Sequence, residues 1–110
     1  MITGGCYCGA VRYQVTGKLT HVTYCHCSKC RRWHGHFGAY TAADRGDFAL
    51  VEPRGLQWHT VSPTVKRAFC NECGSSLLFD ESTMSKISIC AGTIDAPSGV
   101  REKNHIFAGS

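Results

Sequence analysis

Eight cysteines in 110 residues constrain this chain more than any other feature. Seven of them lie in three tight clusters, which read C-x-C at 6–8, C-x-C-x-x-C at 25–30 and C-x-x-C at 70–73. Cysteines so close in sequence do not easily reach disulfide geometry with each other, whereas their thiolates can converge on one ion. The clusters therefore predict metal binding rather than a disulfide framework.

The beginning of the chain agrees with reduced thiols. The stretch MITGGCYCGA lacks the basic start and the long apolar core of a signal peptide, and no apolar run is long enough to span a membrane. We therefore expect a cytoplasmic protein with no membrane segment. A length of 110 residues with 43% apolar residues predicts a single folded domain over residues 1–110.

The net charge argues against nucleic acid as a partner. The formal charge is +4, which by itself would suit an anionic ligand. Seven bound thiolates and two zinc ions would lower it to about +1. The chain also has no long basic stripe with interleaved aromatic residues, so we expect no general affinity for DNA or RNA.

Short alternating segments between turn residues predict a mainly β fold of antiparallel strands with metal-binding turns at strand ends. Strands are expected at residues 11–15, 21–24, 37–41, 48–51, 56–61, 65–69, 77–79, 87–90 and 105–107. Residues 28–34 are expected to form one short helical turn, and no segment has a sustained helical period.

Two of the clusters are similar and suggest one closed site. The pair Cys6 and Cys8 is followed directly by a glycine, and so is the pair Cys70 and Cys73. Glycine after a ligand suits the turn in which backbone N–H groups point at a thiolate. Four sulfurs complete a tetrahedral structural zinc site that would join distant parts of a β domain. Spacing leaves open the other partition, in which Cys6 and Cys8 join the central cluster.

The central cluster supplies Cys25, Cys27 and Cys30. Three protein ligands and one exchangeable position describe a catalytic zinc, whose open position can take water or a substrate thiol as its thiolate. Lys29, Arg31 and Arg32 would offset the net negative charge of such a centre and could bind the carboxylates of an anionic ligand.

Other interpretations of the central cluster stay open. His26, His34 or His36 could supply a fourth ligand and make the site structural, and the three thiols could be free. The three cations could also form a solvated surface run. Cys90, in the alternating stretch KISIC, is interpreted as a buried core cysteine.

The motifs together resemble a known family, the glutathione-dependent formaldehyde-activating enzymes with the centromere protein V-like proteins. The matching stretches are GGCYCGAVRY at 4–13, CHCSKCRRWHG at 25–35, FCNECGSSL at 69–77 and AGTID at 91–95. Three ordered cysteine clusters with AGTID form a specific combination that extends over residues 4–95.

The resemblance implies a fold, a ligand set and an activity. The fold is the β-tent, a set of twisted antiparallel sheets that carries zinc. Cys6, Cys8, Cys70 and Cys73 would bind a structural zinc ion. Cys25, Cys27 and Cys30 would bind a second, catalytic one. The activity would be that of a carbon–sulfur lyase resembling S-hydroxymethylglutathione synthase, which joins glutathione to formaldehyde or cleaves the adduct.

Two other function classes compete with this enzyme hypothesis. One is a zinc-stabilised module that binds protein or nucleic acid without catalysis. The other is a redox or metal-handling protein that uses the central thiols. The stoichiometry of bound zinc separates them from the enzyme, which needs two ions. Neither the substrate nor an oligomeric state follows from the sequence.

Overall fold

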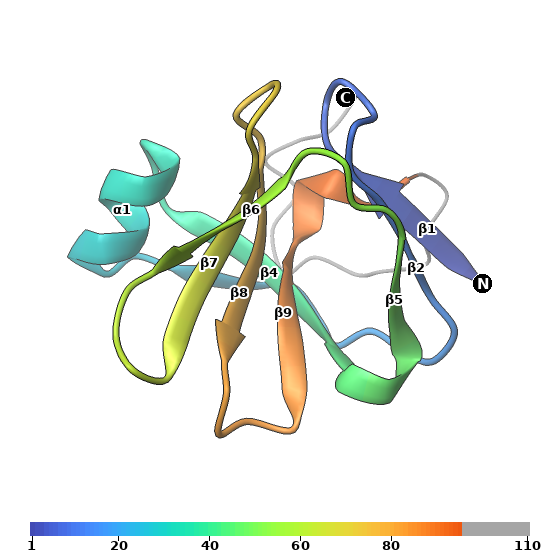
Figure 1. The fold of residues 1–110 in the computed structure, drawn as a ribbon. Helices are drawn as coiled ribbons and strands as arrows, with labels where there is room; N and C mark the ends of the chain where they lie inside the picture. The colour runs from blue at the N-terminus through green and yellow to red at the C-terminus, as the bar shows by residue number, and fades with distance from the viewer. Residues whose placement is uncertain (96–110) are drawn as a thin grey trace, which may run out of the picture.

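The computed structural model describes residues 1–95 and shows two antiparallel sheets and one α-helix (Figure 1). The strands are β1 (Ile2–Gly5), β2 (Arg12–Val15), β3 (Thr23–Cys25), β4 (Gly38–Asp44), β5 (Phe48–Glu52), β6 (Leu56–Thr60), β7 (Val65–Cys70), β8 (Ser76–Glu81) and β9 (Lys86–Cys90). The helix α1 covers Ser28–His34. The prediction of a mainly β fold is confirmed.

The strands of residues 1–95 divide into a smaller and a larger sheet. The smaller sheet has the order β1-β2-β5, and the larger has the order β3-β4-β9-β8-β7-β6. In Figure 1 the smaller sheet stands on one side of the larger, and α1 lies on the opposite side. The two sheets therefore need a connection other than strand pairing.

Most of the expected strands are present, with bounds that differ by one to three residues. The strand expected at 21–24 is β3 at Thr23–Cys25, and the hairpin expected around residues 62–64 joins β6 to β7. The helical turn expected at 28–34 is α1. The strand β1 was not expected. The strand expected at 105–107 lies outside the described residues.

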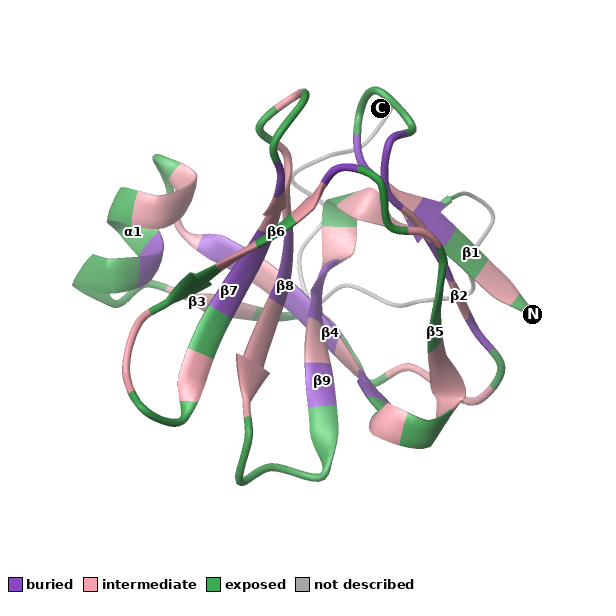
Figure 2. Ribbon diagram, viewed as in Figure 1, coloured by how far each residue is buried: buried purple, intermediate pink, exposed green. Residues whose placement is uncertain are grey.

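The main core lies between the two sheets. From the smaller sheet, Tyr13 and Val15 of β2 are buried, and they belong to the same cluster as Leu77 of β8 and Ile89 of β9. Figure 2 shows buried residues along the central strands of the larger sheet and along β2, whereas much of α1 is exposed. Burial of these apolar side chains supplies the main driving force for folding.

A second, smaller cluster lies near α1. Cys30 of α1, Tyr40 of β4 and Cys90 of β9 are buried together, with Cys25 and Phe79 packed against them. Cys90 is thus a buried core cysteine, as expected, and burial raises the pKa of its thiol to about 12. Within residues 1–95, no helix is long and apolar enough to cross a membrane.

Candidate functional site

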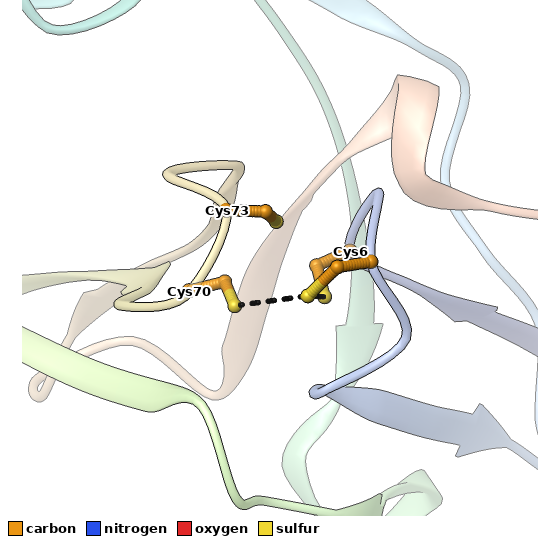
Figure 3. A group of neighbouring side chains, drawn as sticks. Cys6, Cys70 and Cys73 are labelled. Carbon is orange, nitrogen blue, oxygen red and sulfur yellow. Dashed lines mark hydrogen bonds between the residues drawn. The ribbon is translucent and has the colours of Figure 1, made fainter.

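The four-cysteine cluster (Cys6, Cys8, Cys70, Cys73) lies where the two sheets meet. Cys6 and Cys8 stand in the turn between β1 and β2, and Cys70 and Cys73 stand at the end of β7 and in the turn to β8. Figure 3 shows the side chains of Cys6, Cys70 and Cys73 directed toward one another across this junction. The structure therefore combines the first and last cysteine clusters. It does not combine Cys6 and Cys8 with the central cluster, which was the alternative that the spacing left open.

The sulfur positions of this cluster match a tetrahedral ion. All four Sγ atoms lie within 4.8 Å of one another. The Sγ of Cys8 is 3.7 Å from that of Cys6 and 3.8 Å from that of Cys70. A zinc–sulfur bond of 2.3 Å requires sulfur–sulfur edges of about 3.8 Å in a regular tetrahedron, whereas a disulfide would require about 2.05 Å. The spacing suits a metal ion and excludes disulfides.

Backbone N–H groups donate to two of these sulfurs. The N–H of Val11 donates to the Sγ of Cys6 at 3.3 Å, and the N–H of Glu72 donates to the Sγ of Cys70 at 3.4 Å. The glycines that follow the cysteine pairs, Gly9 and Gly74, have φ angles of 86° and 82°. Only glycine adopts this left-handed conformation at little cost, which explains the Cys-Gly pattern.

A serine connects the two turns of the four-cysteine cluster. The N–H of Tyr7 donates to the Oγ of Ser75 at 3.1 Å, and this hydroxyl lies 3.2 Å from the Sγ of Cys73. The hydrogen bond from Ser75 is the main cause that lowers the pKa of Cys73 to about 5. Ser75 thus favours the thiolate that a metal ion requires.

The three-cysteine cluster (Cys25, Cys27, Cys30) lies at the other side of the larger sheet. Cys25 ends β3, Cys27 is the N-cap of α1, and Cys30 lies in the first turn of that helix. Their Sγ atoms lie within 4.8 Å of one another, with 3.4 Å between Cys25 and Cys27. The structure therefore brings the three predicted ligands together at a distance that suits one ion.

The helix start orients this cluster. The N–H of Cys30 donates to the Sγ of Cys27 at 3.4 Å, and this bond is the main cause that lowers the pKa of Cys27 to about 7. Cys30 is buried beneath the helix, whereas Cys27 is exposed. The cluster thus has one side in the core and one side open to the surroundings.

None of the three candidate histidines joins the ligand group of the described residues. The ring of His26 packs on Phe37 at a centroid distance of 4.8 Å, and that of His36 packs on the same ring at 4.3 Å. The Nε2 of His34 lies 2.5 Å from the hydroxyl of Tyr40. Within residues 1–95 the group that could hold a metal ion here therefore consists of three cysteines.

The predicted anion-binding residues lie on the outer face of α1. Lys29, Arg31 and Arg32 are exposed, and within residues 1–95 none of them forms an ion pair. They stand next to the cluster in sequence and leave their charges available to an incoming ligand.

Sequence reasoning missed one residue beside the cluster. Arg67 of β7 is 4% exposed, and its Nη2 donates to the Sγ of Cys30 at 3.5 Å. Its Nη1 donates to the hydroxyl of Tyr40 at 3.0 Å. Arg67 shares one face of an alternating strand with Val65 and Phe69, and this pattern alone does not distinguish a buried arginine from an exposed one.

Comparison with known proteins identifies the family of this chain. The family described as glutathione-dependent formaldehyde-activating enzyme matches residues 1–110. The chain belongs to this family.

Two relatives carry names of the same kind. A Halomonas elongata protein named "Putative glutathione-dependent formaldehyde-activating enzyme" is 30% identical over 107 residues, which cover 87% of this chain and 67% of that protein. An uncharacterized lyase of Schizosaccharomyces pombe is 27% identical over 77 residues. That match covers 69% of this chain and 55% of the relative, so the chain spans about half of the yeast protein's length.

A solved structure has the same fold. The crystal structure of a Rhodobacter sphaeroides protein superposes with a TM-score of 0.73 and covers 88% of this chain and 91% of that chain. The identity is 23%, so this likeness shows the fold alone.

Proposed function

We propose that this protein is a zinc-dependent carbon–sulfur lyase that acts on a thiol–aldehyde adduct at the three-cysteine cluster. The family and the lyase name of a relative support the reaction class. Glutathione and formaldehyde, which the family description names, are the proposed substrate pair. The observation that carries the proposal is a group of three thiols that gains no fourth ligand within residues 1–95.

Zinc held by Cys25, Cys27 and Cys30 with its fourth position open would supply Lewis-acid chemistry that makes a bound substrate thiol a thiolate. The cluster directs Cys27 outward, so the incoming thiol reaches the site from the exposed side. A carbon–sulfur bond forms between the substrate sulfur and the aldehyde carbon. The proton that leaves the sulfur ends on the carbonyl oxygen, and the reverse reaction splits the adduct without another reactant.

The cations of α1 would bind the rest of the substrate. Glutathione carries two carboxylates, and Arg31 and Arg32 offer bidentate donors that match such groups. Lys29 adds a third exposed positive charge on the same helix. Because these side chains are exposed, they would contribute more to substrate orientation and encounter rate than to the stability of the fold.

The same proposal covers the domain, its fold, the number of bound zinc ions and the compartment. Residues 1–110 would form one zinc-binding domain with the β-tent fold of the family, and two zinc ions would be bound. The ion at the four-cysteine cluster would be structural, because its four ligands complete a tetrahedron. The protein would act in the cytoplasm, where both glutathione and its own thiols stay reduced.

The test is the rate of adduct formation measured by exchange NMR with labelled formaldehyde. We expect the zinc-loaded protein to accelerate the reaction of glutathione above the uncatalysed rate. The acceleration should be smaller for 2-mercaptoethanol, which has no carboxylate, and absent in Cys27→Ala. A wild-type protein with two zinc ions and no acceleration would contradict the substrate pair. Tight, steeply salt-dependent binding of DNA or RNA would instead favour a binding module.

A further inference from the structure

We infer that Arg67 is a positioning residue that balances the charge of the three-cysteine cluster and fixes Cys30 within it. The inference rests on the proposal that this cluster binds zinc. It extends the site from three neighbouring cysteines to a strand some forty residues away in the sequence.

The first argument is the burial of an arginine without a carboxylate. Arg67 is 4% exposed, and within residues 1–95 it takes part in none of the four ion pairs. By contrast, Arg12, Arg45 and Arg54 each pair with an acidic side chain. An uncompensated buried charge costs several kcal/mol, so a buried guanidinium needs an anion nearby.

The second argument is the identity of its hydrogen-bond acceptors. Its side-chain acceptors among the described residues are the Sγ of Cys30 at 3.5 Å and the Oη of Tyr40 at 3.0 Å. Both are neutral if Cys30 carries its proton and Tyr40 is an ordinary phenol. Three thiolates around a divalent ion carry a net charge of −1, and this is the charge that Arg67 meets.

The third argument is the rigidity of the guanidinium. Its Cζ lies 4.9 Å from the ring centroid of Phe79 and 5.8 Å from that of Trp33. Trp33 is three residues after Cys30 on α1 and also packs edge-on against Phe69 of β7. Aromatic faces hold a cation in place, so the charge stays at a fixed position relative to the helix.

Tyr40 completes the arrangement. Arginine is a donor only, so the Tyr40 oxygen accepts from Arg67. The hydroxyl proton of Tyr40 is then left for the Nε2 of His34 at 2.5 Å or for the Sγ of Cys30 at 3.9 Å. Arg67 is thereby held at two points, and one of them is itself in contact with the metal ligand.

The strand β7 links the two clusters through this residue. Arg67 lies three residues before Cys70, which ends the same strand and belongs to the four-cysteine cluster. A strand that is fixed at one end by the structural site thus presents a cation to the other site. The three-cysteine cluster depends in this way on a strand that is distant from it in the sequence.

The test compares zinc affinities of variants at Arg67. Arg67→Met keeps an unbranched apolar stem without the charged guanidinium, and Arg67→Lys keeps the charge. Lys66→Met is the matched control, because it removes an exposed cation from the neighbouring position of β7. We expect Arg67→Met to weaken the binding of the second zinc ion by about 10- to 100-fold, the usual effect of losing a partner of a metal ligand. Arg67→Lys should recover most of that loss.

Chelator competition measures both affinities, and cobalt substitution adds a signal from the thiolate ligands that a general loss of stability would not change. We expect the ion of the four-cysteine cluster to bind with equal affinity in all variants, whereas the second ion is that of the three-cysteine cluster. An Arg67→Met protein with wild-type affinity for the second ion and an unchanged cobalt spectrum would overturn the inference. If Arg67→Met does not fold, equal affinities of Arg67→Gln and Arg67→Lys would overturn it. A wild-type protein that binds a single ion would contradict the proposed function itself.

Discussion

The two cysteine clusters use the same ligand in opposite structural settings. The four-cysteine cluster takes its sulfurs from two turns, with Cys8 and Cys70 62 positions apart in the sequence, and joins the smaller sheet to the larger. The three-cysteine cluster takes all its sulfurs from residues 25–30 at the start of one short helix. The four-cysteine cluster connects distant parts of the chain, whereas the three-cysteine cluster connects neighbouring residues only.

This difference has a thermodynamic consequence. Each doubling of a closed loop adds about 0.6 kcal/mol of entropy cost, so closing 62 residues rather than 5 costs about 2 kcal/mol more. The binding free energy of a metal ion at the folded four-cysteine cluster would offset this entropy cost and stabilise the junction of the two sheets. The three-cysteine cluster closes little chain, so metal binding there adds little to the stability of the whole fold. The contrast can be tested one cluster at a time.

The largest effect is expected for Cys70→Ala. Cys70 is fully buried, and its loss removes one of the four proposed ligands and leaves a cavity between the sheets. Structural zinc sites contribute about 10 kcal/mol or more of apparent binding free energy, which is comparable with the whole stability of a small domain. We expect the cooperative unfolding transition followed by circular dichroism to disappear at 37 °C. A cooperatively folded Cys70→Ala protein that binds only the second ion would remove the distinction between the clusters.

An intermediate effect, the loss of one zinc ion with the fold kept, is expected for Cys27→Ala. The variant should keep its fold and one zinc ion but lose the second ion. It also loses the N-cap acceptor for the N–H of Cys30, which costs about 1 kcal/mol and lowers the Tm by about 5 °C. Cys27→Ser is the matched control, because serine restores the cap without restoring the thiolate. Unfolding of both variants to the extent of Cys70→Ala would make the second site structural.

The smallest effect on metal binding is expected for a change that crowds the four-cysteine cluster without removing a cysteine. A Cβ at Gly55 would lie 2.7 Å from the Sγ of Cys70 and 2.9 Å from the Cβ of Ala10. We expect Gly55→Ala to lower the free energy of unfolding by about 1–3 kcal/mol, because the crowded sulfur must move. Gly46→Ala, where a Cβ would have no neighbour within 4 Å, should change it by less than about 0.5 kcal/mol. Denaturant titration of the zinc-loaded proteins measures both changes, and equal stabilities would show that Cys70 has room to adjust.

Much of the local structure could be predicted from the sequence. The alternation of residues 11–15 and 65–69 gave the positions of β2 and β7, and the Cys-Gly endings gave the two turns with left-handed glycines. These features depend on neighbouring residues, so a single sequence contains them. The strand β1 was missed because ITGG has two glycines and no apolar alternation, and it becomes a strand only through pairing with β2.

The surroundings of the three-cysteine cluster could not be predicted in the same way. Arg67 and Tyr40 reach Cys30 from β7 and β4, 37 and 10 residues away. Nothing in the stretch VKRAFC distinguishes a surface arginine from one that is buried against a sulfur. The histidines show the same limit, because spacing allowed His34 as a ligand while its ring nitrogen lies against Tyr40 instead.

The sequence by itself determined the kind of candidate site: clustered thiols that could bind metal ions, in a chain of short strands. It could do so because ligand type and turn geometry are local properties. The tertiary structure decided which clusters combine, which sulfurs are buried and which buried cation stands beside Cys30. These depend on how the two sheets pack against each other, and packing brings together residues that no sequence spacing relates.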